Sequence, residues 1–355
     1  MKRCTRCVLP ETYPGITFDE AGVCNYCRSH QPWQYLGQDA LQRLIEPLRG
    51  RGNEYDCVAG VSGGRDSSYM LYYLVKVCNL RVLAWSADNG FVPEAAKANL
   101  RHMASALGVD LIIQEHDILK RHVHTNVSAW LRHPSPVMIP MICCGCRLGV
   151  SRGLLEHAKL VGAPLVAMSL STPLERGYLK QALFAAHPLG GHIGSHLLSQ
   201  VSTLAYETLR SPAYLKPDNA GICAAEYAYF FHLERIQRLL YPGQRLLDFY
   251  RYIEWDEERI LSTITQQLGW RQDARSASSW RFDCRLSYLK NHLMEHTIGS
   301  TEKEDGLSNM IREGMITRDQ ALERLESETV IPPDLIRELL GDIGLGEAHA
   351  SLVTG

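Results

Sequence analysis

The sequence predicts an α/β protein in which a parallel sheet follows an N-terminal zinc ribbon and precedes a mainly helical C-terminal region. Two C-x2-C pairs stand at the N-terminus, apolar strands alternate with helical patterns up to about residue 171, and the strand signal fades from about residue 180. Repeated strand–helix units are typical of a parallel sheet covered on both faces. The 355 residues are long enough for more than one domain. The expected parts are a ribbon at 1–30, a connecting helix at 31–50, a sheet domain at 51–235 and a helical domain at 236–355.

The first four cysteines have the spacing of a metal site. Cys4, Cys7, Cys24 and Cys27 form two C-x2-C pairs separated by 16 residues. That spacing is typical of a four-thiolate zinc site. The segment between the pairs is rich in proline and glycine, as expected of a ribbon too small to fold without its metal. Free thiols or a redox pair are the alternative.

The sheet domain is predicted from alternating apolar patterns. The expected strands are 56–64, 81–90, 109–117 and 163–171, and the expected helices are 41–48, 67–77, 92–107 and 148–161. Polar residues stand at the strand ends, at Ser62–Ser68, Asp88–Gly90, Glu115–Asp117 and Ser169–Thr172. Ligands of parallel sheets bind outside the carboxyl ends of the strands. We therefore expect these residues to meet on one rim.

The C-terminal half is expected to be helical. The patterns predict helices at 226–240, 257–268, 281–296, 307–313 and 318–325. Before them, HPLGGHIGSH contains His187, His192 and His196. We interpret it as a polar loop over a substrate site, with a metal site as the alternative.

Composition narrows the class of partner. A net charge of −2, with 45% apolar and 21% charged residues, is ordinary for a soluble globular protein and speaks against a nucleic-acid partner. The N-terminus lacks the apolar run of a signal peptide, and no stretch approaches the roughly 20 apolar residues of a membrane span. We expect a cytoplasmic protein without a membrane partner. The sequence is compatible with a homodimer. Disulfides are rare in such a compartment, so the 11 cysteines need another role.

The stretch VAGVSGGRDSSYML at 58–71 leads from a strand through glycines into a helix. Glycines let backbone N–H groups face a ligand, and the helix start adds free N–H groups and a positive dipole end. This combination is typical of a phosphate cradle. A plain strand–helix turn with N-cap serines is the alternative. No Gly-Lys-Ser/Thr follows, so the turn is not a Walker loop.

The turn SGGRDSS resembles the SGGxDS signature of the PP-loop ATP pyrophosphatases. The resemblance implies a Rossmann-like sheet that binds ATP, with Mg²⁺, and cleaves it to AMP and pyrophosphate. It also implies which residues meet the nucleotide. The residues expected at the phosphates are Ser62, Gly63, Gly64, Asp66, Ser67 and Ser68, and Asp88 is expected near the adenosine.

Longer stretches resemble the N-acetyl sugar amidotransferases of surface-polysaccharide pathways. They are CTRCVLPETYPGITFDEAGVCNYC at the N-terminus, LGWR at 268–271 and MITRDQALERLE at 315–326. The resemblance implies conversion of an acetamido to an acetamidino group with ammonia from a glutaminase partner. The fourth strand departs from that family, because it ends Met168-Ser169-Leu170-Ser171 where those enzymes tend to have Gly-Glu-Asn.

A second set of cysteines resembles the iron–sulfur tRNA thiolases of the PP-loop superfamily. Residues 143–149 read CCGCRLG, and Cys223 follows at a distance. By this resemblance Cys143, Cys146 and Cys223 would hold a [4Fe–4S] cluster that carries sulfur, and Cys144 could replace Cys143. A second zinc site, a thiol or persulfide relay and buried structural cysteines are the alternatives. Cys57 and Cys78 are expected in the core, and Cys284 has no evident partner.

Three functions follow from these features. The first is an enzyme that adenylates an amide or carbonyl oxygen and inserts sulfur into a nucleobase or nucleotide, using a sulfur donor. The second is the amidotransferase acting on a nucleotide sugar. The third is a zinc-ribbon nucleic-acid-binding module, against which the intact SGGRDSS turn and the lack of a basic aromatic stripe both speak. Asp66 is the expected catalytic residue of both enzymes, and Cys143, Cys146 and Cys223 are expected to act only in sulfur insertion.

Overall fold

The computed structural model describes residues 1–51, 54–115, 117–176, 178–189, 196–329, 331 and 333–346. Five strands form one parallel sheet in the order β3-β2-β1-β4-β5. The strands are β1 (Cys57–Gly60), β2 (Val82–Asp88), β3 (Leu111–Glu115), β4 (Leu165–Met168) and β5 (Arg245–Asp248). The predicted α/β class and its four strands are confirmed. The sequence does not predict β5, which pairs with β4 and comes after residue 235, the expected end of the sheet domain.

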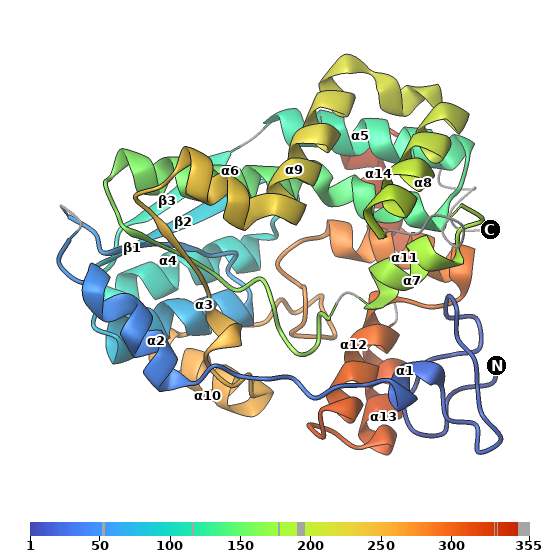
Figure 1. Ribbon diagram of the computed structural model, residues 1–355, viewed down its shortest axis with the longest axis horizontal. Coiled ribbons are helices and arrows are strands. Elements are labelled where there is room, and N and C mark those ends of the chain that lie inside the picture. The colour runs from blue at the N-terminus through green and yellow to red at the C-terminus, as the bar shows by residue number, and fades with distance from the viewer. Residues whose placement is uncertain are drawn as a thin grey trace.

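Helices cover both faces of the sheet, with α6 on one side and α3 and α10 on the other (Figure 1). The covering helices are α3 (Arg65–Tyr72), α4 (Glu94–Leu107), α6 (Cys144–Leu160) and α10 (Glu257–Leu268). Successive residues of a strand point to opposite faces. Val58 and Val166 therefore share a core with Leu154 of α6, whereas Cys57 and Ala84 belong to the core on the other face. Cys57 and Cys78 are buried in that second core, as predicted.

Further helices surround the sheet and extend beyond its carboxyl edge. They are α1 (Asn25–Arg28), α2 (Gln38–Ile45), α5 (Asp117–Arg132), α7 (Tyr178–Ala186), α8 (His196–Arg210), α9 (Pro217–Leu240), α11 (Leu286–Ile298), α12 (Glu302–Arg312), α13 (Arg318–Glu328) and α14 (Pro333–Asp342). Short helical turns are η1 (Glu46–Leu48), η2 (Tyr73–Val77), η3 (Pro136–Cys143), η4 (Pro212–Leu215) and η5 (Phe249–Arg251). The sequence predicts the connecting helix and the helices α10 to α13, and misses α1, α5, α7, α8 and α14.

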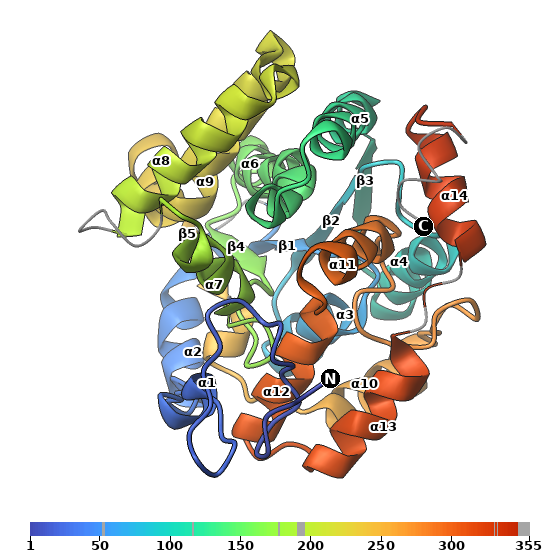
Figure 2. The ribbon, with the colours of Figure 1, turned by 90° about the vertical axis from the view of Figure 1, so that its right-hand side faces the viewer.

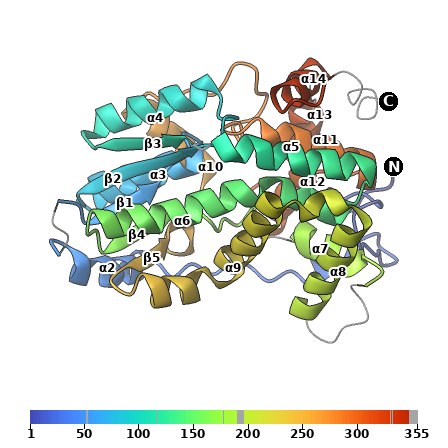
Figure 3. The same cartoon turned by 90° about the horizontal axis from the view of Figure 1, so that it is seen from above.

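A separate hydrophobic core lies beyond the sheet, where α5, α7, α11 and α14 gather (Figure 3). Val123 and Trp130 of α5 pack there with Leu183 of α7, Leu289 of α11 and Leu339 of α14. The ribbon cysteines belong to the same core. The carboxyl edge of the sheet therefore faces a second packed layer, and the candidate site lies between the two.

One helical stretch, Pro136–Leu160, is long and apolar enough to cross a membrane by length and composition alone. The sequence reading overlooks it. About half of its most apolar window, 53%, is buried, and its residues Leu154, Leu155 and Ala158 pack against the sheet. A core helix of a globular protein passes the same test, so the stretch has a packing explanation. The cytoplasmic compartment stays a prediction.

The N-terminal ribbon packs against the C-terminal helices, and Figure 2 shows the first residues beside α12. The Tyr13 hydroxyl donates to the Asp305 carboxylate at 2.8 Å, and the Val8 N–H donates to the Ser308 hydroxyl at 3.3 Å. The Arg318 Nε atom donates to two ribbon carbonyls at 3.1 Å. The ribbon thus packs as one unit with α12 and α13. The predicted domain boundaries stay predictions.

Candidate active site

The turn between β1 and α3 is the centre of the site. Gly63 has a φ of +80°, a conformation that favours glycine, and a Cβ atom there would lie 2.2 Å from the Ala96 carbonyl oxygen. The Ser62 N–H donates to the Ser67 hydroxyl at 3.1 Å, which folds the turn back on the first turn of α3. The resulting loop leaves N–H groups at the start of α3 for an anion.

The loop is held from behind by the LGWR stretch. The Trp270 indole N–H donates to the Gly63 carbonyl oxygen at 2.9 Å, and the Asn99 amide donates to the same oxygen at 3.3 Å. Asn99 also exchanges two hydrogen bonds with the Arg271 backbone, at 2.8 and 2.9 Å. The Gly63 carbonyl is therefore turned away from the ligand side of the loop.

A cavity of about 380 Å³ opens over the turn. Its lining includes Ser62, Gly64, Arg65, Asp66 and Ser67 from the turn. These are four of the six residues expected at the phosphates, together with Arg65. The other two expected residues, Gly63 and Ser68, do not line the cavity. The Gly63 carbonyl oxygen accepts hydrogen bonds from Trp270 and Asn99. The buried Ser68 hydroxyl donates to the Gly64 carbonyl oxygen at 2.7 Å.

Asp66 is oriented by two partners. The Trp255 indole N–H donates to its Oδ1 atom at 2.8 Å, and the Arg65 Nε atom lies 3.6 Å from the same oxygen. Burial raises the pKa of Asp66, while Arg65 and Trp255 act in the opposite direction. These contacts fix the carboxylate at the mouth of the turn.

Asp88, expected near the adenosine, is held by other groups. Its Oδ2 atom lies 2.6 Å from the Lys97 Nζ atom, and its Oδ1 atom accepts from the Gly90 N–H at 2.8 Å. A second cavity of about 180 Å³ lies at the ends of β1, β2 and β4, with Ser86 and Ala87 in its wall. Among the described residues Asp88 lines neither this cavity nor the first. Its side chain shapes the turn that follows β2.

The segment 281–284 brings three polar side chains to the large cavity, and sequence reasoning missed all of them. Arg281 has a φ of +53°, a strained conformation for a non-glycine residue, and its Nε atom lies 3.1 Å from the Glu175 carboxylate. Asp283 sits against the turn, since a Cβ on Gly64 would lie 2.9 Å from its Oδ2 atom. Burial raises the pKa of Asp283. Cys284 follows and lines the same cavity.

Cys143 and Cys146 stand at the start of α6, and Cys143 lines the large cavity. The Asn89 amide nitrogen lies 3.2 Å from the Cys146 sulfur and 3.7 Å from the Cys284 sulfur. Cys284, which had no evident partner in the sequence, therefore joins the predicted pair. The side chains of Cys144 and Cys223 lie outside the described residues, although α9 carries Cys223 beside α6.

The chemistry of these thiols fits a cluster better than a single zinc ion. The sulfur atoms of Cys143, Cys146 and Cys284 do not all lie within 4.8 Å of one another, a spacing that only the ribbon cysteines meet among the described side chains. Zn–S bonds of about 2.3 Å require sulfur atoms roughly 3.8 Å apart. Cys143 and Cys284 line the large cavity, and Cys146 lies near Cys284 through the shared Asn89 amide. Such a set of three thiols would fit an iron–sulfur cluster with an open position.

The ribbon cysteines have the geometry of a mononuclear metal site. All four sulfur atoms lie within 4.8 Å of one another, and those of Cys7 and Cys24 are 3.8 Å apart, as tetrahedral Zn–S bonds require. The buried Arg312 guanidinium donates to the sulfur atoms of Cys27 and Cys7 at 3.5 and 3.6 Å. Because four thiolates and one Zn²⁺ ion leave two negative charges, a buried cation beside them is stabilising. The predicted four-cysteine cluster is confirmed, and zinc as its metal stays a prediction.

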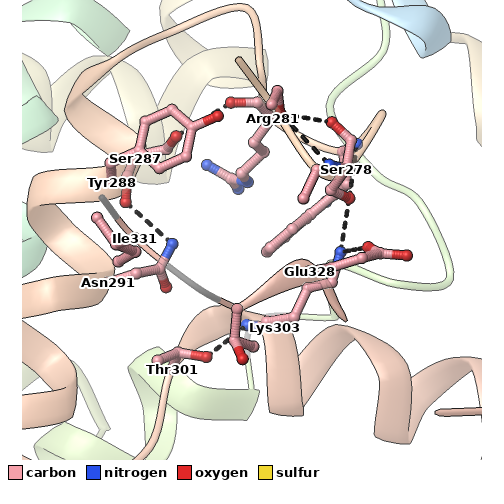
Figure 4. A pocket seen from close by; sticks show the side chains of 13 residues that line it. Ser278, Arg281, Ser287, Tyr288, Asn291, Thr301, Lys303, Glu328 and Ile331 are labelled. Atoms are coloured by element: carbon pink, nitrogen blue, oxygen red, sulfur yellow. Dashed lines mark hydrogen bonds and ion pairs between the residues drawn. The ribbon is translucent and has the colours of Figure 1, made fainter. Parts of the chain in front are cut away.

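A chain of partly buried ion pairs connects the turn to α13. Arg65 pairs with Glu257, and the other Glu257 oxygen lies 2.8 Å from Arg324 of the MITRDQALERLE stretch. Arg324 in turn pairs with Glu328 at 2.8 Å. Glu328 pairs with Lys303, whose Nζ atom also lies 2.6 Å from the Ser278 hydroxyl, beside a pocket of only about 50 Å³ (Figure 4). The turn between β1 and α3 is therefore connected through these ion pairs to the C-terminal helices.

The histidine loop is described only in part. The His187 Nε2 atom lies 2.9 Å from the Glu207 carboxylate, and both side chains are buried. His192 and the side chain of His196 lie outside the described residues. His187 thus has a structural partner in α8, and the role of the loop over the site stays a prediction.

No protein-family model matches the chain. A stretch of 75 residues is 31% identical to the GMP synthase (glutamine-hydrolyzing) of Pyrobaculum aerophilum, covering 21% of this chain and 15% of that protein. A stretch of 183 residues is 22% identical to an uncharacterized protein of Methanocaldococcus jannaschii, covering 50% of this chain and 62% of that protein. The chain therefore spans less than two thirds of the length of either relative.

Among solved structures, the chain is similar to the U34-tRNA thiolase NcsA from Methanococcus maripaludis with its [4Fe–4S] cluster. The TM-score is 0.34 and the identity 14%, over 93% of this chain and 91% of that one. The stretch shared with GMP synthase, the parallel sheet and the SGGRDSS turn together confirm the predicted resemblance to the PP-loop ATP pyrophosphatases.

Proposed function

We propose that the protein is an ATP-dependent enzyme that adenylates an amide or carbonyl oxygen of a small molecule and replaces that oxygen with sulfur. One observation carries the proposal. The cavity of about 380 Å³ is lined both by Ser62 and Ser67 of the phosphate-type turn and by the thiols of Cys143 and Cys284. ATP activation and sulfur transfer would therefore take place in one cavity.

In the first step the substrate oxygen attacks the α-phosphate of ATP. The new O–P bond forms as the bond to pyrophosphate breaks, and pyrophosphate leaves with the electron pair. Backbone N–H groups of the turn and the start of α3 would bind its charge. Arg65, 2% exposed, lines the cavity, and its Nη2 atom has no hydrogen-bond partner among the described residues. A phosphate oxygen would satisfy it.

Mg²⁺ is the cofactor expected with the nucleotide. Asp66 lines the cavity beside the turn, and Asp283 reaches the turn from the opposite wall. Carboxylate oxygens are the ligands that Mg²⁺ prefers, and a carboxylate so close to phosphates is otherwise repelled by them. Asp66 and Asp283 would therefore hold the ion against the phosphate oxygens.

In the second step hydrosulfide attacks the adenylated carbon. A C–S bond forms, the C–O bond to AMP breaks, and AMP leaves with the former substrate oxygen. No oxidant or reductant is needed, because hydrosulfide already has the oxidation state of sulfur in a thioamide. Cys143, Cys146 and a third thiol would hold the [4Fe–4S] cluster, which when bound would supply sulfide in nucleophilic form.

The substrate class is a nucleobase, a nucleotide or a similar heterocycle. The smaller cavity shares Ser62, Ser67 and Ser169 with the large one, so a nucleoside of ATP in the smaller cavity would leave the cysteine side for a second flat ring. The net charge of −2 favours a small molecule over a nucleic acid. A sulfur donor would be the protein partner.

Nitrogen insertion is the second candidate, with ammonia in place of sulfide. The shared stretch with a glutamine-hydrolyzing GMP synthase favours it, as does the resemblance of residues 1–27 and 315–326 to sugar amidotransferases. A nucleotide sugar would then be the substrate, and a glutaminase partner would supply the ammonia. The chemistry of the first step is unchanged.

The proposal is tested with anaerobically purified protein and MgATP. Candidate heterocycles and nucleotide sugars are offered as acceptors, each with sulfide or with ammonium. We expect AMP and pyrophosphate in equal amounts, and a product whose mass shows an oxygen-to-sulfur exchange, only with sulfide. Turnover with ammonium by iron-free protein would establish the second candidate instead. Failure to form AMP and pyrophosphate with any acceptor would overturn both.

A further inference from the structure

We infer that Cys284 is the third thiol of the cysteine site and that Asn89 is the positioning residue that orients it. The inference rests on the proposed function, because it assigns residues of that same site. The resemblance to the iron–sulfur tRNA thiolases implies Cys223 as the third thiol, and the sequence shows no partner for Cys284. Contacts on the sulfur atoms provide a stronger criterion.

The orientation of the Asn89 amide is fixed by the backbone. Its Oδ1 atom accepts a hydrogen bond of 2.9 Å from the Phe91 N–H, and an N–H can only donate. The Nδ2 atom must therefore point the other way, toward the sulfur atoms of Cys146 and Cys284 at 3.2 and 3.7 Å. Asn89 is 8% exposed, so solvent competes little for these hydrogen bonds.

Phe91, which orients the Asn89 amide, also holds the backbone beside Cys284. The N–H of the next residue, Arg285, donates to the Phe91 carbonyl oxygen at 3.0 Å, and Phe91 is fully buried. One residue thus fixes both the amide that binds the sulfur and the backbone that carries it. The Arg285 guanidinium adds ion pairs to Glu338 and Asp342 of α14, at 2.6 and 2.9 Å. These contacts fix the backbone next to Cys284 and therefore the position of its thiol.

The neighbours of Cys284 connect it to the nucleotide side of the cavity. Asp283, adjacent in sequence, sits against Gly64 of the phosphate-type turn, and Cys284 itself lines the cavity with Cys143. A sulfur atom held by Cys143, Cys146 and Cys284 would therefore face the carbon activated at the turn. Three thiols around a cluster leave one iron without a protein ligand, so no fourth cysteine is required.

The hydrogen bonds from Asn89 have a defined chemical consequence. An amide N–H that donates to sulfur stabilises the thiolate over the thiol and lowers the electron density on a bound metal. It also fixes the side-chain rotamers of Cys146 and Cys284 with respect to each other. Asn89 thus strengthens metal binding although it is not itself a ligand.

Two measurements test the inference without substrate or ATP, so a failure of the proposed reaction leaves them interpretable. In metal-free, reduced wild-type protein a short bifunctional thiol reagent should link Cys146 to Cys284, as identified by peptide mass spectrometry. After anaerobic reconstitution with iron and sulfide, Cys284→Ser should lose the bound iron, and Asn89→Ala should bind it roughly 10-fold more weakly. Cys223→Ser and the core control Cys78→Ser should both retain iron at the wild-type level.

A link from Cys146 to Cys223 in place of Cys284 would overturn the inference, as would loss of iron in Cys223→Ser with retention in Cys284→Ser. Thermal unfolding of each variant separates loss of a ligand from loss of the fold. Should Cys284→Ser not fold, the cross-link in wild-type protein and the iron affinity of Asn89→Ala still decide the outcome, since both keep every cysteine.

Discussion

The Trp270 indole donates to the Gly63 carbonyl oxygen across 2.9 Å, although 206 residues separate the two in the chain. Trp270 is 5% exposed and packs edge-to-face on Phe282, the residue before Asp283. The LGWR stretch therefore supports both walls of the candidate site, because the same tryptophan touches the phosphate-type turn and the segment that carries Cys284.

Trp270→Phe should keep the packing and remove the hydrogen bond. We expect a loss of about 1 kcal/mol in the free energy of unfolding together with weaker ATP binding, because the Gly63 carbonyl is then held by Asn99 alone. Denaturant unfolding and equilibrium binding of ATP measure the two effects. Trp130→Phe is the matched control, since it removes a buried indole hydrogen bond of 3.0 Å to the Ser135 carbonyl far from the turn. Equal ATP affinities in Trp270→Phe and Trp130→Phe would contradict this role.

Asp66→Ala should reduce AMP and pyrophosphate formation at least about 100-fold and leave the fold intact. Trp255→Phe should show a smaller effect with a different signature. The indole N–H favours the charged carboxylate, so its removal should raise the pKa of Asp66 and move the acid limb of the pH–rate profile to higher pH. An unmoved acid limb, or wild-type pyrophosphate release by Asp66→Ala, would show that Asp66 has no part in the reaction.

Lys303 should make stability depend on alkaline pH. Burial lowers the pKa of its ammonium group to about 8 in spite of Glu328, whereas the unfolded value is near 10.4. Between these values the unfolded chain binds more protons, so this group makes the folded state more stable as the pH rises, by roughly 3 kcal/mol in total. Lys303→Met should flatten the rise in denaturant unfolding between pH 8 and 10. Identical pH profiles in both proteins would refute the assignment.

Loss of one ribbon thiol should remove metal and stability together. Cys4→Ser or Cys24→Ser should lower the zinc content and the melting temperature, because metal binding and folding of so small a unit are coupled. Cys78→Ser, a core thiol outside the cluster, serves as the control for the loss of a buried sulfur. Unchanged zinc content in both ribbon variants would leave the site without support. Chelation should also weaken the packing of α12, since Arg312 contacts two of the thiols.

Local patterns were sufficient for part of the fold. Apolar patterns identify the strands β1 to β4, and the glycines between a strand and a helix identify the turn at Ser62–Ser68, because these signals depend on neighbours in the chain. The edge strand Arg245–Asp248 reads RLLD, and two apolar residues between charged ones give no strand signal. The ribbon was readable because C-x2-C spacing reflects the reach of short loops around one ion.

The rest of the site depends on contacts between distant segments. Cys284 is a lone cysteine in the sequence, and only the packing of Phe91 against its neighbour brings it to Asn89. Asp88 ends a strand as expected, but Lys97 one turn into the following helix captures its carboxylate. The sequence does contain one signal for segment 281–284. It is the stretch RFDC, in which a cysteine stands among charged residues in a region of helical pattern.

The bracing of the turn by Trp255, Glu257, Trp270 and Arg324 has a consequence for biosynthesis. The SGGRDSS loop leaves the ribosome long before the residues that clamp it, and the ribbon emerges first although its docking surface on α12 and α13 emerges last. A chain that stops before Arg324 therefore keeps the loop but loses part of its bracing. We expect such a chain to bind a nucleotide more weakly than the 355-residue chain does.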